Sequence, residues 1–554
     1  MSNLANQPIN SSFPGLLQIP GGITSSLQTV QDGNGNATGL QISSTSVSAI
    51  TASNFTATHN GAAITGAVAR PISDGFGDYL SVKDFGAVGD NTHDDTTAIQ
   101  AAINYGISSG TAVIYFPVGI YKITSTLNVS AGLISLKGQA SGWFGGGGST
   151  IRMATANTTI IHIYGASAAA QINSNEVTDL LLVHGETSGD DTNTAGSGIL
   201  VENTVRTLID NVVIIGMNSG IKFNFVIDAF VTRTRIHRLF NIPAGTAYGI
   251  WLVDDGTHFN ASNTFRDMII SGSPTRTGSF YGVSYNGSGL NDQFFENIET
   301  SLCEIGFQFV LTSPVVQYDI KIHKCVIDNY KIYGIDLYGF TNAGGVDIIG
   351  GWCAPAAGLS GTVAGIHIAN CAGIKVLGIE MVGISNVTNT SSYGILASSS
   401  TDCQIIGNRI RDFYTNIGSD TLVNTVISGN SIKNTTATAP TYLCVLNTNS
   451  TKNTVVGNVF DAGTAAGVGL FLGSGSINNA VSGNTYPGTF TVVSVQDVNS
   501  GASANKNTII SYGTTTGAAA ATGTLTNAPI AGNPTYWHPI IIEGTRYYFP
   551  CWAA

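Results

Sequence analysis

The sequence predicts a right-handed parallel β-helix, an all-β fold in which the chain coils and each turn stacks on the one before it. Short Gly–apolar–x–apolar segments recur at intervals of 22 to 33 residues. A second apolar segment lies between successive copies of the first. Glycine is abundant, with 68 residues, and charged residues make up 10% of the chain, against about 25% in ordinary globular domains. This composition favours short strands and tight turns over amphipathic helices.

The first repeat begins with a glycine in every copy. A repeat of two or three short strands cannot bury its apolar face alone, so copies stacked about 4.8 Å apart are expected to close one continuous core. The repeat glycines are Gly198, Gly220, Gly249, Gly282, Gly306, Gly334, Gly365 and Gly394.

The second repeat occupies residues 263–270, 293–300, 320–327, 346–353 and 374–381. Its later copies contain a Gly–Asn pair. Because like residues stack on like in such a coil, the asparagines are expected to form a ladder of side-chain amide hydrogen bonds. They are Asn408, Asn430, Asn458 and Asn484.

The chain divides into four regions. Residues 1–78 are small and polar, without a hydrophobic period, and predict an extended stalk. Residues 79–132 contain the one expected helix, over about 95–107, where Asp94 or Asp95 can cap the first turn. Placed before the first rung, this helix is suited to cap the coil. Residues 133–500 form the coil itself, and residues 501–554 end in a β-hairpin that turns at Glu543 and Gly544.

Several protein classes are disfavoured. The net charge is -11 and no Lys/Arg cluster occurs, which argues against a nucleic-acid partner. No run of about 18 apolar residues predicts a membrane span, and the N-terminus lacks the pattern of a signal peptide. The seven cysteines show no metal-ligand spacing and are expected to be buried free thiols. No metal or other cofactor is expected.

Four segments, in order, resemble the N-terminal signature of the pectate-lyase-like β-helix superfamily. They are DFGAVGD at 84–90, DDTTAIQAAI at 94–103, YFPVGIY at 115–121 and the apolar strand that ends in KGQ at 137–139. The superfamily includes polygalacturonases, pectate lyases, epimerases and phage tailspikes. Its tailspike branch fits best, because a polar stalk without a signal peptide precedes the coil and an aromatic segment follows it.

This resemblance implies a bacteriophage tailspike that binds and depolymerises a host surface polysaccharide, a capsule or an O-antigen, by hydrolysis of glycosidic bonds. It also implies a homotrimer, assembled in the host cytoplasm and attached to other tail or baseplate proteins through its N-terminal region. Two alternatives stay open: a polysaccharide lyase that acts by β-elimination, and a receptor-binding tail fibre without enzymatic activity. The polygalacturonase acid set does not occur on matching rungs, so the resemblance supplies no catalytic residue. The sugar, the host, and a site within or between subunits also stay open.

The first candidate site lies on the second repeat, where Arg266, Glu296 and His323 align on three consecutive rungs. Glycosidases use two carboxylates about 5–9.5 Å apart, and stacked rungs supply such spacings. The predicted catalytic residues are Glu296, Glu299, Asp267 and His323, with Arg266 binding the substrate and Asp292 and Glu304 flanking. The competing interpretation is a solvated or inter-subunit salt ladder, and a one-residue change of register would turn these side chains inward.

The second candidate site is the variable position of the first repeat, which reads Lys222, Trp251, Ser284, Gln308, Asp336 and His367. Trp251 is predicted to stack on a sugar ring, with burial against a neighbouring chain as the alternative. Asp336 and His367 are predicted to bind substrate as an acid–base pair, with a surface ion pair as the alternative. The loop with Asp254, Asp255 and His258 follows Trp251, and Asp254, Asp255 and Tyr281 are predicted to bind the substrate. In a lyase, Tyr281 would act together with Arg266 and His323.

Overall fold

The computed structural model describes residues 28–31, 37–42, 79–110, 112–142, 147–184, 193–237, 245–273, 278–312, 319–341, 345–383, 389–435, 442–463, 466–499, 507–510, 536–542 and 545–551. The chain forms two compact units, Met1–Leu80 and Ser81–Ala554. In the first unit, β1 (Gln28–Gln31) and β2 (Ala37–Ile42) pair antiparallel. The rest of the predicted stalk lies outside the described residues.

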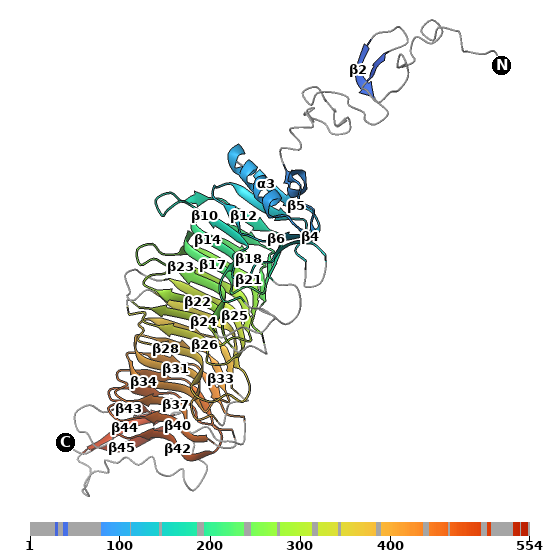
Figure 1. Cartoon of the computed structure of the whole chain (residues 1–554). Coiled ribbons are helices and arrows are strands. Elements are labelled where there is room, and N and C mark those ends of the chain that lie inside the picture. Colours follow the sequence, from blue (N-terminus) through green and yellow to red (C-terminus); the bar gives the residue numbers. More distant parts are fainter. Residues whose placement is uncertain are drawn as a thin grey trace, which may run out of the picture. The chain divides into compact units, whose positions relative to one another are not determined.

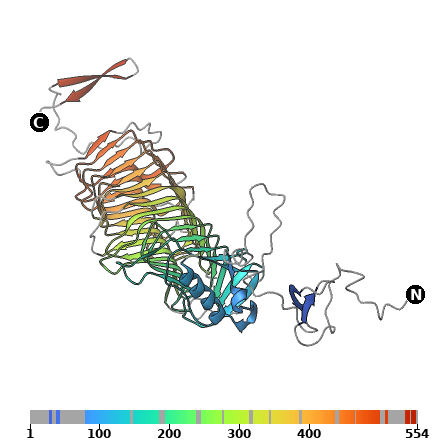
Figure 2. The same cartoon turned by 90° about the horizontal axis from the view of Figure 1, so that it is seen from above.

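The second unit is a parallel β-helix, which confirms the predicted fold class. Figures 1 and 2 show its turns stacked in chain order. Its strands form three ladders, here named ladders A, B and C. Ladder A contains the first sequence repeat and consists of β7 (Leu127–Val129), β10 (Ile161–Tyr164), β14 (Ser197–Val205), β17 (Ser219–Ile227), β20 (Thr246–Val253), β22 (Ser279–Gly287), β24 (Ile305–Leu311), β26 (Tyr333–Tyr338), β28 (Val363–Ala369), β31 (Ser392–Thr401), β34 (Thr415–Val423), β37 (Tyr442–Asn447), β40 (Ala466–Leu472) and β42 (Phe490–Asp497), with β11 (Ile172–Asn173) beside β14.

Ladders B and C contain the second repeat. Ladder B begins with β3 (Leu80–Ser81), β5 (Ala112–Phe116), β8 (Ile134–Gly138), β12 (Glu176–Thr178), β15 (Leu208–Asp210) and β18 (Phe230–Thr232), and ends with β29 (Ile374–Leu377), β32 (Gln404–Ile406), β35 (Val426–Ser428), β38 (Thr454–Val456), β41 (Ala480–Ser482) and β43 (Thr508–Ile510). Ladder C begins with β4 (Asp90–Asp94), β6 (Gly119–Ile123), β9 (Ser149–Met153), β13 (Leu181–His184), β16 (Val213–Ile215) and β19 (Arg235–His237), and ends with β30 (Glu380–Val382), β33 (Arg409–Arg411), β36 (Ser431–Lys433) and β39 (Val459–Asp461). Between these, four bent strands belong to both ladders: β21 (Ala261–Ser271), β23 (Asn291–Ser301), β25 (Ile320–Tyr330) and β27 (Val346–Pro355).

A single left-handed residue makes the corner between ladders B and C on each of these bent strands. Asp267 has φ 56°, Asn297 has φ 53° and Lys324 has φ 54°, and Gly350 takes the same position with φ 63°. Asp and Asn tolerate this backbone region better than other side chains do. The corner turns the residues that follow it onto a different face of the coil.

The repeat glycines of ladder A are required by close packing between rungs. They do not need a positive φ, but a Cβ atom at any of the seven from Gly198 to Gly365 would lie 2.8 Å or less from the carbonyl oxygen of the glycine on the next rung. At Gly220 the added carbon would also lie 2.5 Å from Cγ2 of Ile236, which projects into the core from ladder C. Any larger residue would separate the two ladders at this point.

The predicted asparagine ladder is confirmed. The Nδ2 atom of each asparagine donates to Oδ1 of the next, at 3.0 Å from Asn408 to Asn430, 2.9 Å from Asn430 to Asn458 and 2.9 Å from Asn458 to Asn484. All four side chains are buried. A second ladder joins Asn453, Asn479 and Asn507 at 3.0 Å per step. Each amide satisfies the next, so the coil can carry these polar groups inside.

The predicted helix is α3 (Thr96–Ser109), which contacts β5, β7 and β8 at the first turn of the coil (Figure 1). The helix buries its own residues Ile99, Ala102 and Ile103. Asp94, rather than Asp95, accepts a hydrogen bond from the first turn, at 3.1 Å from the Thr96 amide. The Asp95 carboxylate instead accepts from the backbone of Val88 and Gly89, just after the short 3-10 helix Val82–Phe85.

At the other end of the chain, β44 (Tyr536–Ile542) and β45 (Thr545–Cys551) pair antiparallel as the predicted hairpin. Its predicted turn residues, Glu543 and Gly544, lie outside the described residues. Six cysteines are buried free thiols, as predicted: Cys303, Cys325, Cys353, Cys371, Cys403 and Cys444. In the described ranges, the structure contains no helix that is both long and apolar enough to cross a membrane.

Candidate functional site

The variable positions of the first repeat form one row along ladder A, in the predicted register. Lys222 pairs with Trp251, Trp251 with Ser284, Ser284 with Gln308, Gln308 with Asp336, and Asp336 with His367. We call these six residues the ladder A row. A parallel row beside it contains Tyr248, Tyr281 and Tyr333 on the same ladder. Polar and aromatic groups therefore follow one another along the axis at the spacing of the rungs.

Asp336 and His367 form a hydrogen-bonded pair in the ladder A row. The His367 Nδ1 atom lies 2.8 Å from Oδ1 of Asp336, and the two side chains are 17% and 11% exposed. The Tyr333 ring stacks on the imidazole, with centroids 4.5 Å apart. An ionised carboxylate only accepts hydrogen bonds, so Nδ1 of His367 carries the proton. The Nε2 atom is then the nitrogen available for proton transfer.

Two carboxylates act on the phenol of Tyr281. Burial raises the pKa of Tyr281, and the negative charges of Glu304 and Asp336 raise it further. Glu304 directly precedes β24, whereas Asp336 lies on β26, the next strand of ladder A. The Glu304 carboxylate is held by the Phe280 amide at 3.3 Å and by Lys331 Nζ at 3.4 Å. The sequence placed Glu304 only as a flanking residue, because its position before the strand hides its proximity to Tyr281.

Trp251 is already packed within the chain. The Tyr248 ring stacks on the indole with centroids 4.5 Å apart and an angle of 11° between the planes. The Lys222 ammonium lies 4.1 Å from the centroid of the indole, a cation–π contact. The predicted stacking of Trp251 on a sugar would require one of these two partners to move. Trp251 therefore packs within the row, against one residue of its own strand and one of the strand before it.

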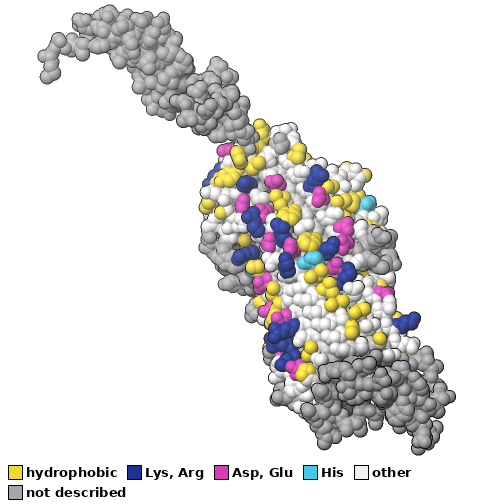
Figure 3. Space-filling view, turned by 180° about the vertical axis from the view of Figure 1, so that it is seen from behind, with side chains coloured by type: hydrophobic (Ala, Val, Ile, Leu, Met, Phe, Trp, Pro, Cys, Tyr) yellow, Lys and Arg dark blue, Asp and Glu magenta, His cyan; other side chains and the backbone are white. Residues whose placement is uncertain are grey.

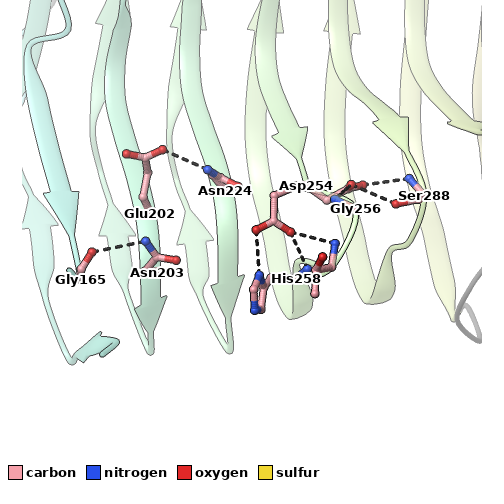
Figure 4. A network of polar contacts seen from close by, with 10 residues as sticks. Gly165, Glu202, Asn203, Asn224, Asp254, Gly256, His258 and Ser288 are labelled. Atoms are coloured by element: carbon pink, nitrogen blue, oxygen red, sulfur yellow. Dashed lines mark hydrogen bonds and ion pairs between the residues drawn. The ribbon is translucent and has the colours of Figure 1, made fainter. Parts of the chain in front are cut away.

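A second pair of histidine and carboxylate lies toward the N-terminal end of ladder A. His162 Nε2 is 2.7 Å from Glu202 Oε2, and Asn224 donates to the other carboxylate oxygen at 3.1 Å. The hydrogen bond with His162 is the main cause that lowers the pKa of Glu202. Figure 4 shows the contact between Glu202 and Asn224. Sequence analysis missed this pair, because His162 lies before the first glycine of the repeat.

The two aspartates of the loop after β20 have different hydrogen-bond partners (Figure 4). Asp254 accepts hydrogen bonds from the Tyr285 hydroxyl, the Ser288 amide and the Gly256 amide, so its carboxylate braces the loop. Asp255 accepts from His258 Nδ1 at 2.8 Å and from the His258 amide, and these bonds lower its pKa to about 2. Asp255 and His258 remain well exposed. Of this loop, they are the pair that a ligand can reach.

Arg266, Glu296 and His323 lie on three consecutive rungs of ladder B and point outward, as predicted. The Glu296 carboxylate lies 3.4 Å from Lys324 Nζ. Burial is the main cause that lowers the pKa of His323. Three aligned charged or titratable groups thus form a mixed patch on this ladder.

The other two predicted catalytic residues do not share that face. Asp267 is a corner residue, where it accepts a hydrogen bond from Asn297 at 2.7 Å and pairs with Arg266 at 3.3 Å. Glu299 lies past the Asn297 corner, on ladder C between Ile269 and Val326. Only Glu296 contributes a carboxylate to the three-residue patch. The ladder A row, with its hydrogen-bonded pair of Asp336 and His367, is therefore the better candidate for acid–base chemistry.

Among the residues that the structure describes, no three His, Cys, Asp or Glu side chains are grouped so as to hold a metal ion. Residues 79–327 match the family model described as rhamnogalacturonase A/epimerase, pectate lyase-like. Over these residues the chain is therefore similar to the pectate lyase-like family. Trp251, Tyr281, Glu304 and the ladder B patch lie inside the matched stretch. Asp336 and His367 lie beyond it, on rungs that continue the same coil.

The chain is also similar to curated proteins over a short stretch. Mannuronan C5-epimerase AlgE5 of Azotobacter vinelandii is 45% identical over 60 residues, which are 11% of this chain and 6% of the epimerase. A glucan 1,3-beta-glucosidase of Cochliobolus carbonum is 41% identical over 54 residues, or 10% of this chain and 7% of that enzyme. The chain thus spans less than a tenth of the length of these relatives.

Among solved structures, the tailspike protein of E. coli bacteriophage HK620 in complex with a pentasaccharide has a TM-score of 0.60 to this chain. The two are 12% identical, and the match covers 79% of this chain and 81% of the tailspike. At this identity the similarity establishes the shared fold.

Proposed function

We propose that this chain is a phage tailspike that binds a bacterial surface polysaccharide along ladder A and hydrolyses its glycosidic bonds. The observation that carries the proposal is the Asp336–His367 pair, set in an extended row of polar and aromatic groups with Glu304 and Tyr281 beside it. The shared fold with a tailspike solved in complex with a pentasaccharide supports it. So does the local similarity to epimerases named for a polysaccharide, mannuronan.

In this proposal the residues of ladder A divide the chemistry between them. Asp336 holds the imidazole of His367 in one orientation and tautomer. Nε2 takes a proton from the water whose oxygen bonds to the anomeric carbon, and returns it to the oxygen of the departing sugar as the glycosidic bond breaks. The Glu304 carboxylate, paired with Lys331, stabilises the positive charge that develops on the sugar ring. Lys222, Gln308 and Tyr281 hold neighbouring sugar units along the row.

A lyase is the second candidate, and one observation favours it. His367 can remove the proton next to the carboxylate of a uronate, and the Tyr333 ring stacks on its imidazole. Burial is the main cause that raises the pKa of Tyr333, so this phenol stays protonated and can protonate the departing oxygen. Elimination would leave an unsaturated uronate that absorbs ultraviolet light, whereas hydrolysis would not.

The test is to incubate the purified full chain with capsular polysaccharides and O-antigens from a panel of bacteria. Hydrolysis is expected to release oligosaccharides that carry one added water per cut, measured by mass spectrometry. Products without the added water, with ultraviolet absorption, would identify the lyase. Binding without any change in polymer size, on every glycan that is bound, would identify a receptor-binding fibre and overturn the enzymatic proposal.

The same proposal includes assembly into a homotrimer and placement in the virion. Residues 1–78 would attach the protein to other tail or baseplate proteins, and residues 501–554 would support oligomer contacts. Sedimentation of the full chain measures the oligomeric state. A monomer at micromolar concentration would contradict the trimer without touching the proposed chemistry.

A further inference from the structure

Ladder C carries a groove of about 410 Å³ toward the C-terminal end of the coil. Two outward rows border it. Glu380, Arg409 and Ser431 follow one another in the first row, and Arg411, Lys433 and Asp461 in the second. Figure 3 shows Lys and Arg side chains gathered near this end of the described coil. Three of the chain's 22 Lys and Arg residues line this single groove.

The groove has more hydrogen-bond donors than its own carboxylates use. Arg409 Nη1 and Arg411 Nε share one oxygen of Glu380, at 3.5 and 3.9 Å, and Lys433 Nζ lies 2.9 Å from Asp461. Each guanidinium has five N–H donors and a lysine ammonium has three. Within the described residues, Arg411 Nε is buried and makes no hydrogen bond. Donors therefore remain for an acceptor that enters from outside.

A buried carboxylate holds two of the residues that line the groove. Asp412 is fully buried, accepts a hydrogen bond from the Thr435 hydroxyl at 2.7 Å, and pairs with Arg411 Nη1 at 3.4 Å. Its corner position, with φ 63°, follows directly after β33. Arg411 and Thr435 are thus held in place before any ligand binds, which lowers the ordering cost of binding.

We propose that this groove is a second carbohydrate site, which binds an acidic sugar unit through its carboxylate. Arg409, 66% exposed, and Lys433, 47% exposed, can reach a carboxylate at the mouth, and forked guanidinium donors match its two oxygens. The hydroxyls of Ser431 and Thr435 suit the hydroxyls of the same sugar. The site lies on a different ladder from the Asp336–His367 pair, so it would hold an acidic polymer rather than cut it.

The test measures binding of a short oligouronate to the full chain by titration calorimetry, with a neutral oligosaccharide of the same length as the comparison ligand. The variant is Arg409→Gln with Lys433→Gln, two outward side chains whose loss leaves the side-chain contacts of Asp412 intact. The matched control is Arg206→Gln with Lys452→Gln, which removes one Arg and one Lys from exposed positions elsewhere. Both variants change the net charge equally.

The groove variant is expected to lose about tenfold or more in affinity for the oligouronate, because two charge-assisted contacts disappear. The control variant is expected to bind as the wild type does, and the neutral ligand is expected to show no difference between the three proteins. Oligouronate that binds at ladder A would still bind to the groove variant. Such binding would appear in the titration of that variant as a remaining site. Equal weakening in both variants, or no weakening in the groove variant, would overturn the proposal, whatever the cleavage assays show.

Discussion

The Nδ1 atom of His367 lies 2.8 Å from Oδ1 of Asp336, on the strand directly before it in ladder A. The two residues are 31 positions apart in the chain and meet because β26 and β28 pair in register. The pair is largely buried between the rows of ladder A, with Tyr333 stacked on the imidazole. A histidine held this way has one nitrogen engaged and one available, which is the arrangement a proton-transfer group requires.

His367→Gln is expected to lower the rate of polysaccharide cleavage by about a hundredfold or more, because the side chain can no longer move a proton. Release of reducing ends measures the rate, and calorimetry measures binding, which is expected to persist. His162→Gln is the matched control, since it removes a histidine that is also bonded to a carboxylate on ladder A. Equal losses in the two variants would show that neither pair is specifically catalytic.

Asn430→Ala is expected to lower the free energy of unfolding by about 2–4 kcal/mol, because buried amide groups of Asn408 and Asn458 lose their partner. Chemical denaturation measures the effect. Gln404→Ala removes an exposed amide on ladder B and is expected to change stability by less than about 0.5 kcal/mol. A small effect at Asn430 would mean that water replaces the lost amide inside the coil.

Gly220→Ala is expected to destabilise the coil by about 1–3 kcal/mol through overpacking against Ile236 and the next rung. Thermal unfolding monitored by circular dichroism measures the shift. Gly345→Ala is the control, because the nearest atom to its added carbon, Oδ1 of Asp347, would lie 3.6 Å away, at ordinary contact distance. If the two variants unfold at the same temperature, the rungs are less tightly packed than the structure indicates.

Acidification is expected to destabilise the fold through His237. Burial first, and the charge of Arg235 second, lower its pKa to about 4, whereas the unfolded chain has the ordinary value of about 6.5. Between these values the unfolded state binds more protons, so this contribution to stability is lost as the pH falls from about 6.5 toward 4. Unfolding temperatures at pH 7 and pH 5 measure it. His237→Gln should narrow the difference, whereas His93→Gln, at an exposed position, should not.

The register of both candidate rows could be predicted from the sequence. Side chains alternate along a strand with a period of two, and stacked repeats put equivalent positions on neighbouring rungs. Those two local rules suffice to align Arg266 with Glu296 and His323, and Asp336 with His367. They also suffice for the asparagine ladder, since identical residues at one repeat position stack directly on each other.

Other relationships depend on three-dimensional packing that has no sequence period. Asn297 takes the corner conformation, so Glu296 and Glu299 face different sides of the coil, although they are three residues apart. Tyr248 and Lys222 cover the indole of Trp251, and Glu304 approaches Tyr281 from outside the repeat. The basic groove arises where Arg409, Arg411 and Lys433 meet across two rungs. The repeat of short apolar segments determined the coil and the alignment of its rungs, because these segments are buried only when successive turns of the chain stack on one another. The corners and side-chain contacts decided which aligned residues share a site, because direction and distance exist only once the chain is folded.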